Sequence, residues 1–179
     1  MKKAIIGLML IMSAFVLIGC SSKAPQVPLE PMSEKLRFEK ITFQFDQKYP
    51  TKIQYQSPEA LEKRINDKII VLMVEKGLLS NDTSMDTLKI DVGYYRGFVG
   101  EGIPLLATES LAPPTVGFDI RVIKGEKEIR TIKRYNLMYD GGLLANLSVM
   151  AGANRDNEYE NKAADALAKE IVNRIEKLR

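Results

Sequence analysis

Cys20 carries the most reactive side chain of the 179-residue sequence, and it is the chain's one cysteine. A thiol can act as a nucleophile, a metal ligand, a disulfide partner or a point of covalent attachment. The sequence contains no histidine, which removes the commonest general base and the commonest ligand of transition metals. A single cysteine without histidine forms neither a Cys–His catalytic pair nor a thiolate metal site.

Motifs of other enzyme classes are missing as well. The sequence has no Gly-x-Ser-x-Gly elbow and no Ser-x-x-Lys dyad. Gly97, Gly100 and Gly102 have the reverse of the dinucleotide-binding spacing, and no Gly-Lys-Ser/Thr follows them to bind phosphate. The acidic residues near position 158 lack the spacing of a calcium-binding loop, and helix capping explains them better. We therefore expect a protein that is not an enzyme and that holds neither a metal nor a cofactor.

The segment Leu17-Ile18-Gly19-Cys20 resembles the lipobox of a bacterial lipoprotein. Lys2 and Lys3 are followed by 15 uncharged residues, and small Gly19 precedes the cysteine, as an export signal requires. This run is shorter than the about 20 apolar residues that span a bilayer. The resemblance implies that residues 1–19 are cleaved and that Cys20 is acylated, with several chains at about 0.8 kcal/mol per buried CH₂ making a stable anchor. The alternative is an ordinary signal with Cys20 as an incidental thiol.

The residues after Cys20 predict a tether and the membrane to which the protein is sorted. Residues 20–35 contain three prolines within seven positions and little to bury, which predicts an extended, semi-rigid tether. Ser21 directly after the cysteine, in place of aspartate, resembles the pattern of enterobacterial lipoproteins sorted to the outer membrane. In a Gram-negative host, the resemblance implies an outer-membrane anchor with the remaining domain, residues 36–179, facing the periplasm.

The charge balance argues against nucleic acid as a partner. Lysines and arginines number 26 against 23 acidic residues, and removing Lys2 and Lys3 with the signal leaves 24 against 23, a net charge near +1. Nucleic-acid-binding domains normally carry a basic stripe, whereas the charges here are interspersed. A mature chain of this length forms one domain with a core large enough to need no disulfide.

Hydrophobic periodicity predicts an α+β domain with a four-stranded mixed sheet and two helices packed on one face. Alternating apolar residues predict four strands, and apolar residues at helical spacing predict two helices. In chain order, the elements are expected near residues 41–46, 58–76, 88–95, 116–122, 128–139 and 157–178. The facing of the fourth strand stays ambiguous, because its apolar residues divide between two faces. Ile129, Tyr135, Leu137 and Tyr139 fit one face, whereas Ile132 and Met138 fit the other.

Capping residues place the ends of both helices. Ser57 before Pro58 predicts the start of the first helix, and Gly77 predicts its end. Asp156 or Asn157 caps the last helix, and with Asn157 as the cap, the residue three positions later completes a capping box. We expect the charged residues of both helices to face solvent.

Chain direction predicts that three connections share one pole of the domain. A right-handed crossover makes the first two strands parallel, and the next strands follow as a meander. The connections Gln47–Gln56, Val99–Pro114 and Gly141–Ala153 then lie together, opposite the turn Lys124–Lys127. The two later connections are long and apolar. One interpretation is that apolar residues of these connections fold inward as a minor core: Leu105, Leu106, Leu143, Leu144, Leu147 and Met150. The other is that they form a partner-binding surface, with the candidate residues Ile103, Leu105, Leu106, Leu143, Leu144 and Leu147.

Two weaker patterns suggest ligand contacts. The hairpin around the Lys124–Lys127 turn is basic, which indicates either solvated charge or contact with lipid phosphates. Its candidate anion-binding residues are Arg121, Lys124, Lys127, Arg130 and Arg134. The segment Tyr94-Tyr95-Arg96 at the end of the second predicted strand could stack on a sugar ring, although tyrosines of the core fit the pattern better.

With its lipobox, proline-rich tether and element order, the chain resembles families of small outer-membrane lipoproteins. The nearest in element order is the lipopolysaccharide-assembly lipoprotein that plugs the outer-membrane translocon, and activators of peptidoglycan synthases are a second family. The resemblance implies a non-catalytic, lipid-anchored component of envelope assembly that binds another envelope protein. A lipoprotein that binds a glycolipid or glycan, such as lipopolysaccharide, is the alternative. Cys20 is the one residue that carries a family role.

Overall fold

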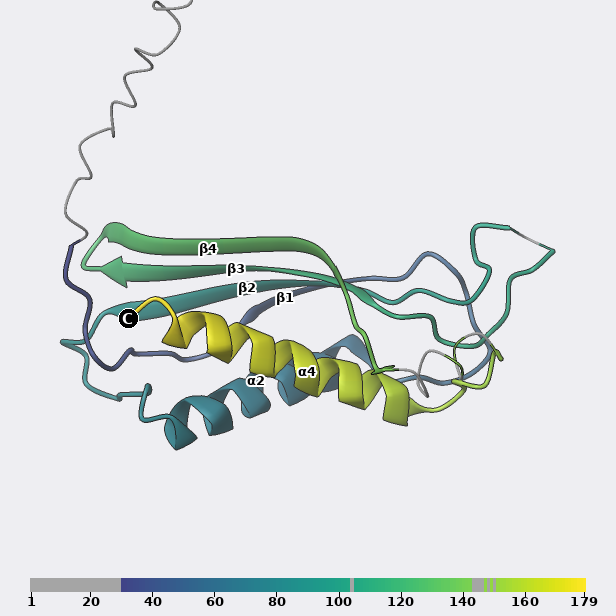
Figure 1. Ribbon diagram of the computed structural model, residues 1–179, viewed down its shortest axis with the longest axis horizontal. Coiled ribbons are helices and arrows are strands. Elements are labelled where there is room, and N and C mark those ends of the chain that lie inside the picture. The colour runs from purple at the N-terminus through teal and green to yellow at the C-terminus, as the bar shows by residue number, and fades with distance from the viewer. Residues whose placement is uncertain (1–29, 104, 143–146, 148, 150) are drawn as a thin grey trace, which may run out of the picture.

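The computed structural model describes residues 30–103, 105–142, 147, 149 and 151–179, so the predicted signal peptide and Cys20 lie outside the described residues. The described elements follow the predicted order (Figure 1). They are β1 (Thr42–Asp46), α2 (Pro58–Glu75), β2 (Thr87–Tyr95), β3 (Thr115–Lys124), β4 (Lys127–Met138) and α4 (Asn157–Glu176). Both helices cover one face of the sheet, which confirms the predicted α+β fold class.

The sheet has the strand order β1-β2-β3-β4, with one parallel and two antiparallel pairings. β1 pairs parallel to β2 from Thr42↔Asp91 to Asp46↔Tyr95, as the crossover through α2 predicts. The pairs β2–β3 and β3–β4 are antiparallel. The three long connections therefore lie at one end of the sheet, and the tight β3–β4 turn lies at the other end, beside residue 30 (Figure 1). We call the first end the loop pole.

The main core fills the space between the helices and one face of the sheet. From β2 and β3, the alternate residues face it, among them Ile90, Phe118 and Ile120, which are almost fully buried. From the helices, Ile69 and Ile171 are fully buried in the same cluster. Burying each such side chain contributes about 1.5–3 kcal/mol relative to exposure, so this cluster supplies most of the stability of the domain.

Two irregularities in β4 explain the ambiguity of its sequence pattern. The pairing with β3 shifts between Val116 and Phe118 and again between Val122 and Ile123. At each shift β4 contains one extra residue, so two residues of β4 lie opposite one residue of β3. Beyond each such bulge, the side chains of β4 that face the core change from odd to even positions or the reverse. As a result, Ile129, Ile132 and Leu137 all pack against the main core despite their uneven spacing, whereas Tyr135 and Met138 are exposed.

The helix ends agree with the predicted caps in part. The Ser57 hydroxyl accepts a hydrogen bond from the Ala60 N–H at 3.2 Å, and Gly77 has a φ of 64° directly after α2. At α4 the cap is Asp156, whose Oδ1 accepts from the Glu158 N–H at 2.9 Å. The capping box based on Asn157 is therefore wrong.

Candidate interaction site at the loop pole

The connection from β2 to β3 forms a hairpin-like loop that projects from the loop pole (Figure 1). Phe98 and Leu111 form an antiparallel bridge at its base. Two backbone hydrogen bonds continue this ladder, from the Val99 N–H to the Ser110 carbonyl and from the Thr108 N–H to the Val99 carbonyl, both at 2.9 Å. The loop is thus a folded element and not an open linker.

Gly100 closes the loop where the chain reverses. Its φ is 77°, and a Cβ atom at this position would lie 2.1 Å from the Leu106 carbonyl oxygen. Because the obstructing atom belongs to the backbone, a side chain here could not be accommodated without opening the turn. The Ile103 N–H donates to the Gly100 carbonyl at 2.9 Å, which tightens the same turn.

The apolar side chains of this loop point outward. Leu105 is 94% exposed, and Ile103 and Leu106 are more than half exposed. Leu147 from the next connection is half exposed, while Leu143 and Leu144 lie outside the described residues. The interpretation of Leu105 and Leu106 as part of a minor core is therefore wrong. We refer to Ile103, Leu105 and Leu106 as the apolar tip. Their role in binding a partner stays a prediction.

A different set of side chains makes the minor core beneath the loop pole. It consists of Tyr55, Phe98, Leu111 and Tyr159, with Tyr49, Ile53, Tyr139 and Val149 packed around them. The Phe98 ring contacts two tyrosines at centroid distances of 5.5 and 5.8 Å, which are favourable aromatic separations. Aromatic residues from several connections thus hold the base of the loop in place.

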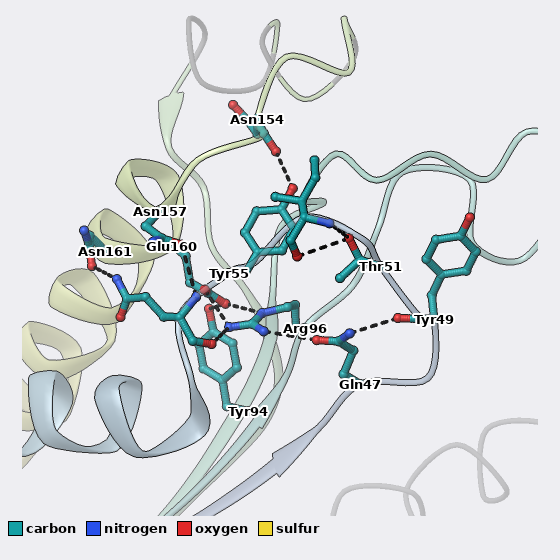
Figure 2. A network of polar contacts seen from close by, with 12 residues as sticks. Gln47, Tyr49, Thr51, Tyr55, Tyr94, Arg96, Asn154, Asn157, Glu160 and Asn161 are labelled. Atoms are coloured by element: carbon teal, nitrogen blue, oxygen red, sulfur yellow. Dashed lines mark hydrogen bonds and ion pairs between the residues drawn. The ribbon is translucent and has the colours of Figure 1, made fainter.

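A buried ion pair joins the residue directly after β2 to α4 at the same pole (Figure 2). The Arg96 guanidinium donates from Nε and Nη2 to the two oxygens of Glu160, each at 2.7 Å. Arg96 is 5% exposed and Glu160 is 2% exposed. Bidentate contacts of this kind are the strongest ion pairs in proteins, and burial strengthens them further.

The remaining donors of Arg96 bind the connection between β1 and α2. Nη1 donates to the Gln47 side-chain oxygen at 3.1 Å, and Nη2 donates to the Gln56 carbonyl at 2.7 Å (Figure 2). The guanidinium also lies over the Phe45 ring at 4.8 Å, a cation–π contact. One side chain therefore holds both ends of the connection between β1 and α2 and the first turn of α4.

This network contradicts two sequence interpretations. Glu160 does not face solvent, because its position continues the apolar stripe of α4 and points it into the protein. Tyr94 is buried, and its O–H donates to Glu160 at 3.3 Å, so it belongs to the core and does not form a sugar platform. Burial raises the pKa of the Tyr94 hydroxyl well above its ordinary value, with the Glu160 charge adding to the effect.

Glu101 connects the loop to the last residue of β2. One carboxylate oxygen accepts from the Phe98 N–H at 2.8 Å, and the other accepts from the Tyr95 O–H. The hydrogen bond to Glu101 is the main reason that the pKa of Tyr95 rises to about 12. The protonated tyrosine is therefore the form that supports the loop.

Alkaline titration should detect this contact. Because the folded-state pKa lies above the ordinary value of 10.0, the stabilisation is complete below pH 10 and is lost as the pH rises toward about 12. In the difference between the tyrosinate absorbance curves of the wild type and Tyr95→Phe, we expect one tyrosine titrating near pH 12. A difference curve centred near pH 10 would contradict the contact.

The basic hairpin lies at the end of the sheet opposite to the loop pole. Lys127 forms an ion pair with Glu30 at 2.6 Å, and the Arg130 Nη2 donates to the Glu30 carbonyl at 2.7 Å. The hydrogen bond from Lys127 lowers the pKa of the Glu30 carboxyl. Lys124 donates to the carbonyl of residue 31 at 3.1 Å. These cations bind residues 30 and 31, which lie within the predicted tether of residues 20–35.

The other two candidate anion-binding residues have separate environments. Arg121 pairs with Asp91 on the neighbouring strand, and Arg134 is exposed on β4. Anion binding by the hairpin stays a prediction. In the part of the chain that the structure describes, no three His, Cys, Asp or Glu residues gather as metal ligands. None of its helices combines the length and the apolar character needed to cross a bilayer.

Comparisons with known proteins do not assign the chain to a family. No protein-family model matches it, and no curated protein sequence matches it. Among solved structures, the chain is similar to a minor lipoprotein from Acinetobacter baumannii, with 15% sequence identity and a TM-score of 0.39. The match covers 81% of this chain and 92% of that chain. A similarity at this level assigns neither a family nor a function.

Proposed function

We propose that the protein is a non-catalytic lipoprotein of the bacterial envelope, anchored to the outer membrane through Cys20, that captures an envelope protein with its apolar tip. The observation that carries this proposal is the exposure of Leu105, at 94%, on a loop closed by Gly100. Burying a leucine side chain is favourable by about 1.5–3 kcal/mol. A pocket of the partner that covered Leu105 would add this free energy to binding. Exposed apolar residues on a folded loop are typical of interaction sites.

The charges around the apolar tip favour a protein over a bilayer as its partner. The segment from residue 97 to residue 113 contains Glu101 and Glu109 but no lysine or arginine. Loops that insert into anionic bilayers commonly carry cations beside their apolar residues. Two glutamates there oppose binding to such a surface and suit a pocket with basic residues at its rim.

The arrangement of the domain also supports a partner away from the anchoring membrane. The described chain begins at Glu30 beside the β3–β4 turn, at the end of the sheet opposite to the loop pole (Figure 1). Ten residues from Cys20 to Glu30 reach at most about 35 Å. A strand of the length of β4 spans about 40 Å, so a domain standing on its tether would present the apolar tip well beyond the anchor.

Photocrosslinking in cells tests the proposal. A photoreactive residue replacing Leu105 should form a discrete protein adduct, because the side chain there would enter the partner. The matched control is position 126 in the β3–β4 turn, which is also exposed but lies at the other end of the sheet. Mass spectrometry of the adduct would name the partner.

The same experiment can contradict the proposal in two ways. Adducts of equal yield from positions 105 and 126 would indicate unspecific contact, and adducts with lipid alone would assign the apolar tip to a membrane. A second variant, Leu105→Ser, should remove capture of the identified partner while the melting temperature stays unchanged, since this side chain supports no core. A large fall in melting temperature would instead assign Leu105 a structural role.

A further inference from the structure

The face of the sheet that carries no helix contains a groove of about 850 Å³ (Figure 1 shows the uncovered face). Gly93 of β2 and Gly117 of β3 both line the groove and are direct partners in the register. On one side of this glycine row lie Asp91 and Asp119, which are also direct partners. On the other side lies Tyr95. The groove therefore runs across the strands, with carboxylates on one wall and an aromatic ring on the other.

The space around Gly93 differs from the space around Gly117. A Cβ atom on Gly117 would lie 3.1 Å from the Arg134 carbonyl oxygen and 3.2 Å from Cδ1 of Tyr135, so the Tyr135 ring already covers this position. A Cβ atom on Gly93 would meet nothing within 4 Å, and Gly93 does not have a positive φ. Glycine weakens the interior of a strand and often marks the close approach of a ligand. No packing of the described residues explains Gly93.

The two tyrosines of the groove are held in place through their hydroxyls. The Tyr135 O–H donates to Asp119 at 2.7 Å, and the Tyr95 O–H donates to Glu101. Lys48 lies 5.7 Å from the centroid of the Tyr95 ring and restrains it further. Rings fixed before binding lose little conformational entropy when a ligand stacks on them. The groove is thus preorganised for a flat, partly apolar ligand.

The side chains of this face that line the groove are polar, and cations beside the groove offset two of its three carboxylates, Asp46, Asp91 and Asp119. Asp91 pairs with Arg121, and Asp119 pairs with Lys133 at 3.3 Å. These carboxylates remain hydrogen-bond acceptors without creating a strong field. The other polar side chains on this face of the groove are Thr42, Gln44, Asp46, Thr115 and Asn136. A polar groove with a small excess of carboxylate and a tyrosine ring on one wall does not suit lipid chains, phosphates or anionic polymers.

We propose that this groove is a binding site for a neutral glycan, with a sugar ring placed over Gly93 between Tyr95 and Tyr135. The apolar face of a pyranose stacks on tyrosine, while its hydroxyl and amide groups donate to the carboxylates and to Gln44. The site lies on the uncovered face of the sheet and uses neither the apolar tip nor the anchor. It therefore does not depend on the function proposed above.

Calorimetric titration of the full-length chain tests the site, in a detergent without a sugar headgroup. The probes are chitohexaose, a neutral polymer of N-acetylated sugars, and maltohexaose, which lacks the acetamido groups. We expect saturable binding of at least one of them by the wild type. Gly93→Val should weaken this binding at least tenfold by placing a side chain in the groove, while the melting temperature stays the same or rises because valine suits a strand.

The control is Lys89→Val, which places the same side chain on the same strand and face but outside the groove. It should bind the glycan as the wild type does. A second variant, Asp46→Ala, removes an exposed acceptor at the groove and should weaken binding at least threefold. The proposal is overturned if neither probe binds, if Gly93→Val binds as well as Lys89→Val, or if only polygalacturonate or oligolysine binds.

Discussion

Replacing Glu160 with alanine is expected to lower the free energy of unfolding by about 3–5 kcal/mol, the usual effect of removing one partner from a buried ion pair. The substitution would leave the Arg96 guanidinium, which is 5% exposed, without its bidentate partner. Denaturant unfolding of the wild type and the variant, followed by circular dichroism, measures the difference. Glu160→Leu with Arg96→Met should recover much of the loss, since an apolar pair leaves no charge buried.

The matched control for this prediction is the ion pair between α2 and α4. Arg64 and Asp165 also form a bidentate contact, at 2.8 Å, but their side chains are 39% and 38% exposed. Water screens this pair, so Asp165→Ala should cost at most about 1 kcal/mol. Equal losses for Glu160→Ala and Asp165→Ala would mean that the Arg96 network does not hold the loop pole together.

Gly100→Ala is expected to open the loop that carries the apolar tip. An L-residue in the left-handed region costs about 1–2 kcal/mol, and the overlap of the new Cβ with the Leu106 carbonyl adds about 1–3 kcal/mol as overpacking. The turn should therefore refold or fray, and its amide protons should exchange faster. Hydrogen exchange of residues 98–111, measured by mass spectrometry, reports this change directly.

Gly102→Ala provides the comparison two residues away in the same loop. Gly102 does not have a positive φ, and a Cβ atom there meets nothing within 4 Å. Exchange in this variant should match the wild type. If both alanine variants exchange alike, the closure at Gly100 is not what holds the loop, and the structural basis for presenting Leu105 is lost.

The elements of the fold were predictable because their signals are local. The alternation from Leu88 to Tyr94 and the helical spacing from Leu61 to Met73 each follow from neighbouring residues, and the structure confirms both elements. The facing of β4 was not predictable, because its two bulges arise from pairing with β3. Nothing within β4 itself shows where an extra residue is inserted.

The polar network and the groove depend on contacts between distant segments. Arg96 and Glu160 are 64 positions apart, and neither residue alone identifies its partner. One signal was present, since Glu160 occupies the apolar stripe that Ala163 and Leu167 continue, and a charged residue there requires a buried partner. Gly93 gave no comparable signal, because a glycine in a strand reveals its empty surroundings only when the sheet is assembled.

The parallel pairing of β1 and β2 also determines how the domain would respond to mechanical force. The chain reaches the sheet at the end near Glu30, where Arg37 forms a bridge with Thr87, and β1 and β2 then run in the same direction toward the loop that carries Leu105. Tension between these two points pulls the neighbouring strands past each other along their length. The backbone hydrogen bonds between the paired residues, from Thr42↔Asp91 to Asp46↔Tyr95, lie across this direction and share the load. A force that separated the two strands from one end would instead break these hydrogen bonds one after another. If the proposed anchor and the proposed partner pull on the domain from these two ends, the strand pair is loaded in shear, the geometry in which it is hardest to separate.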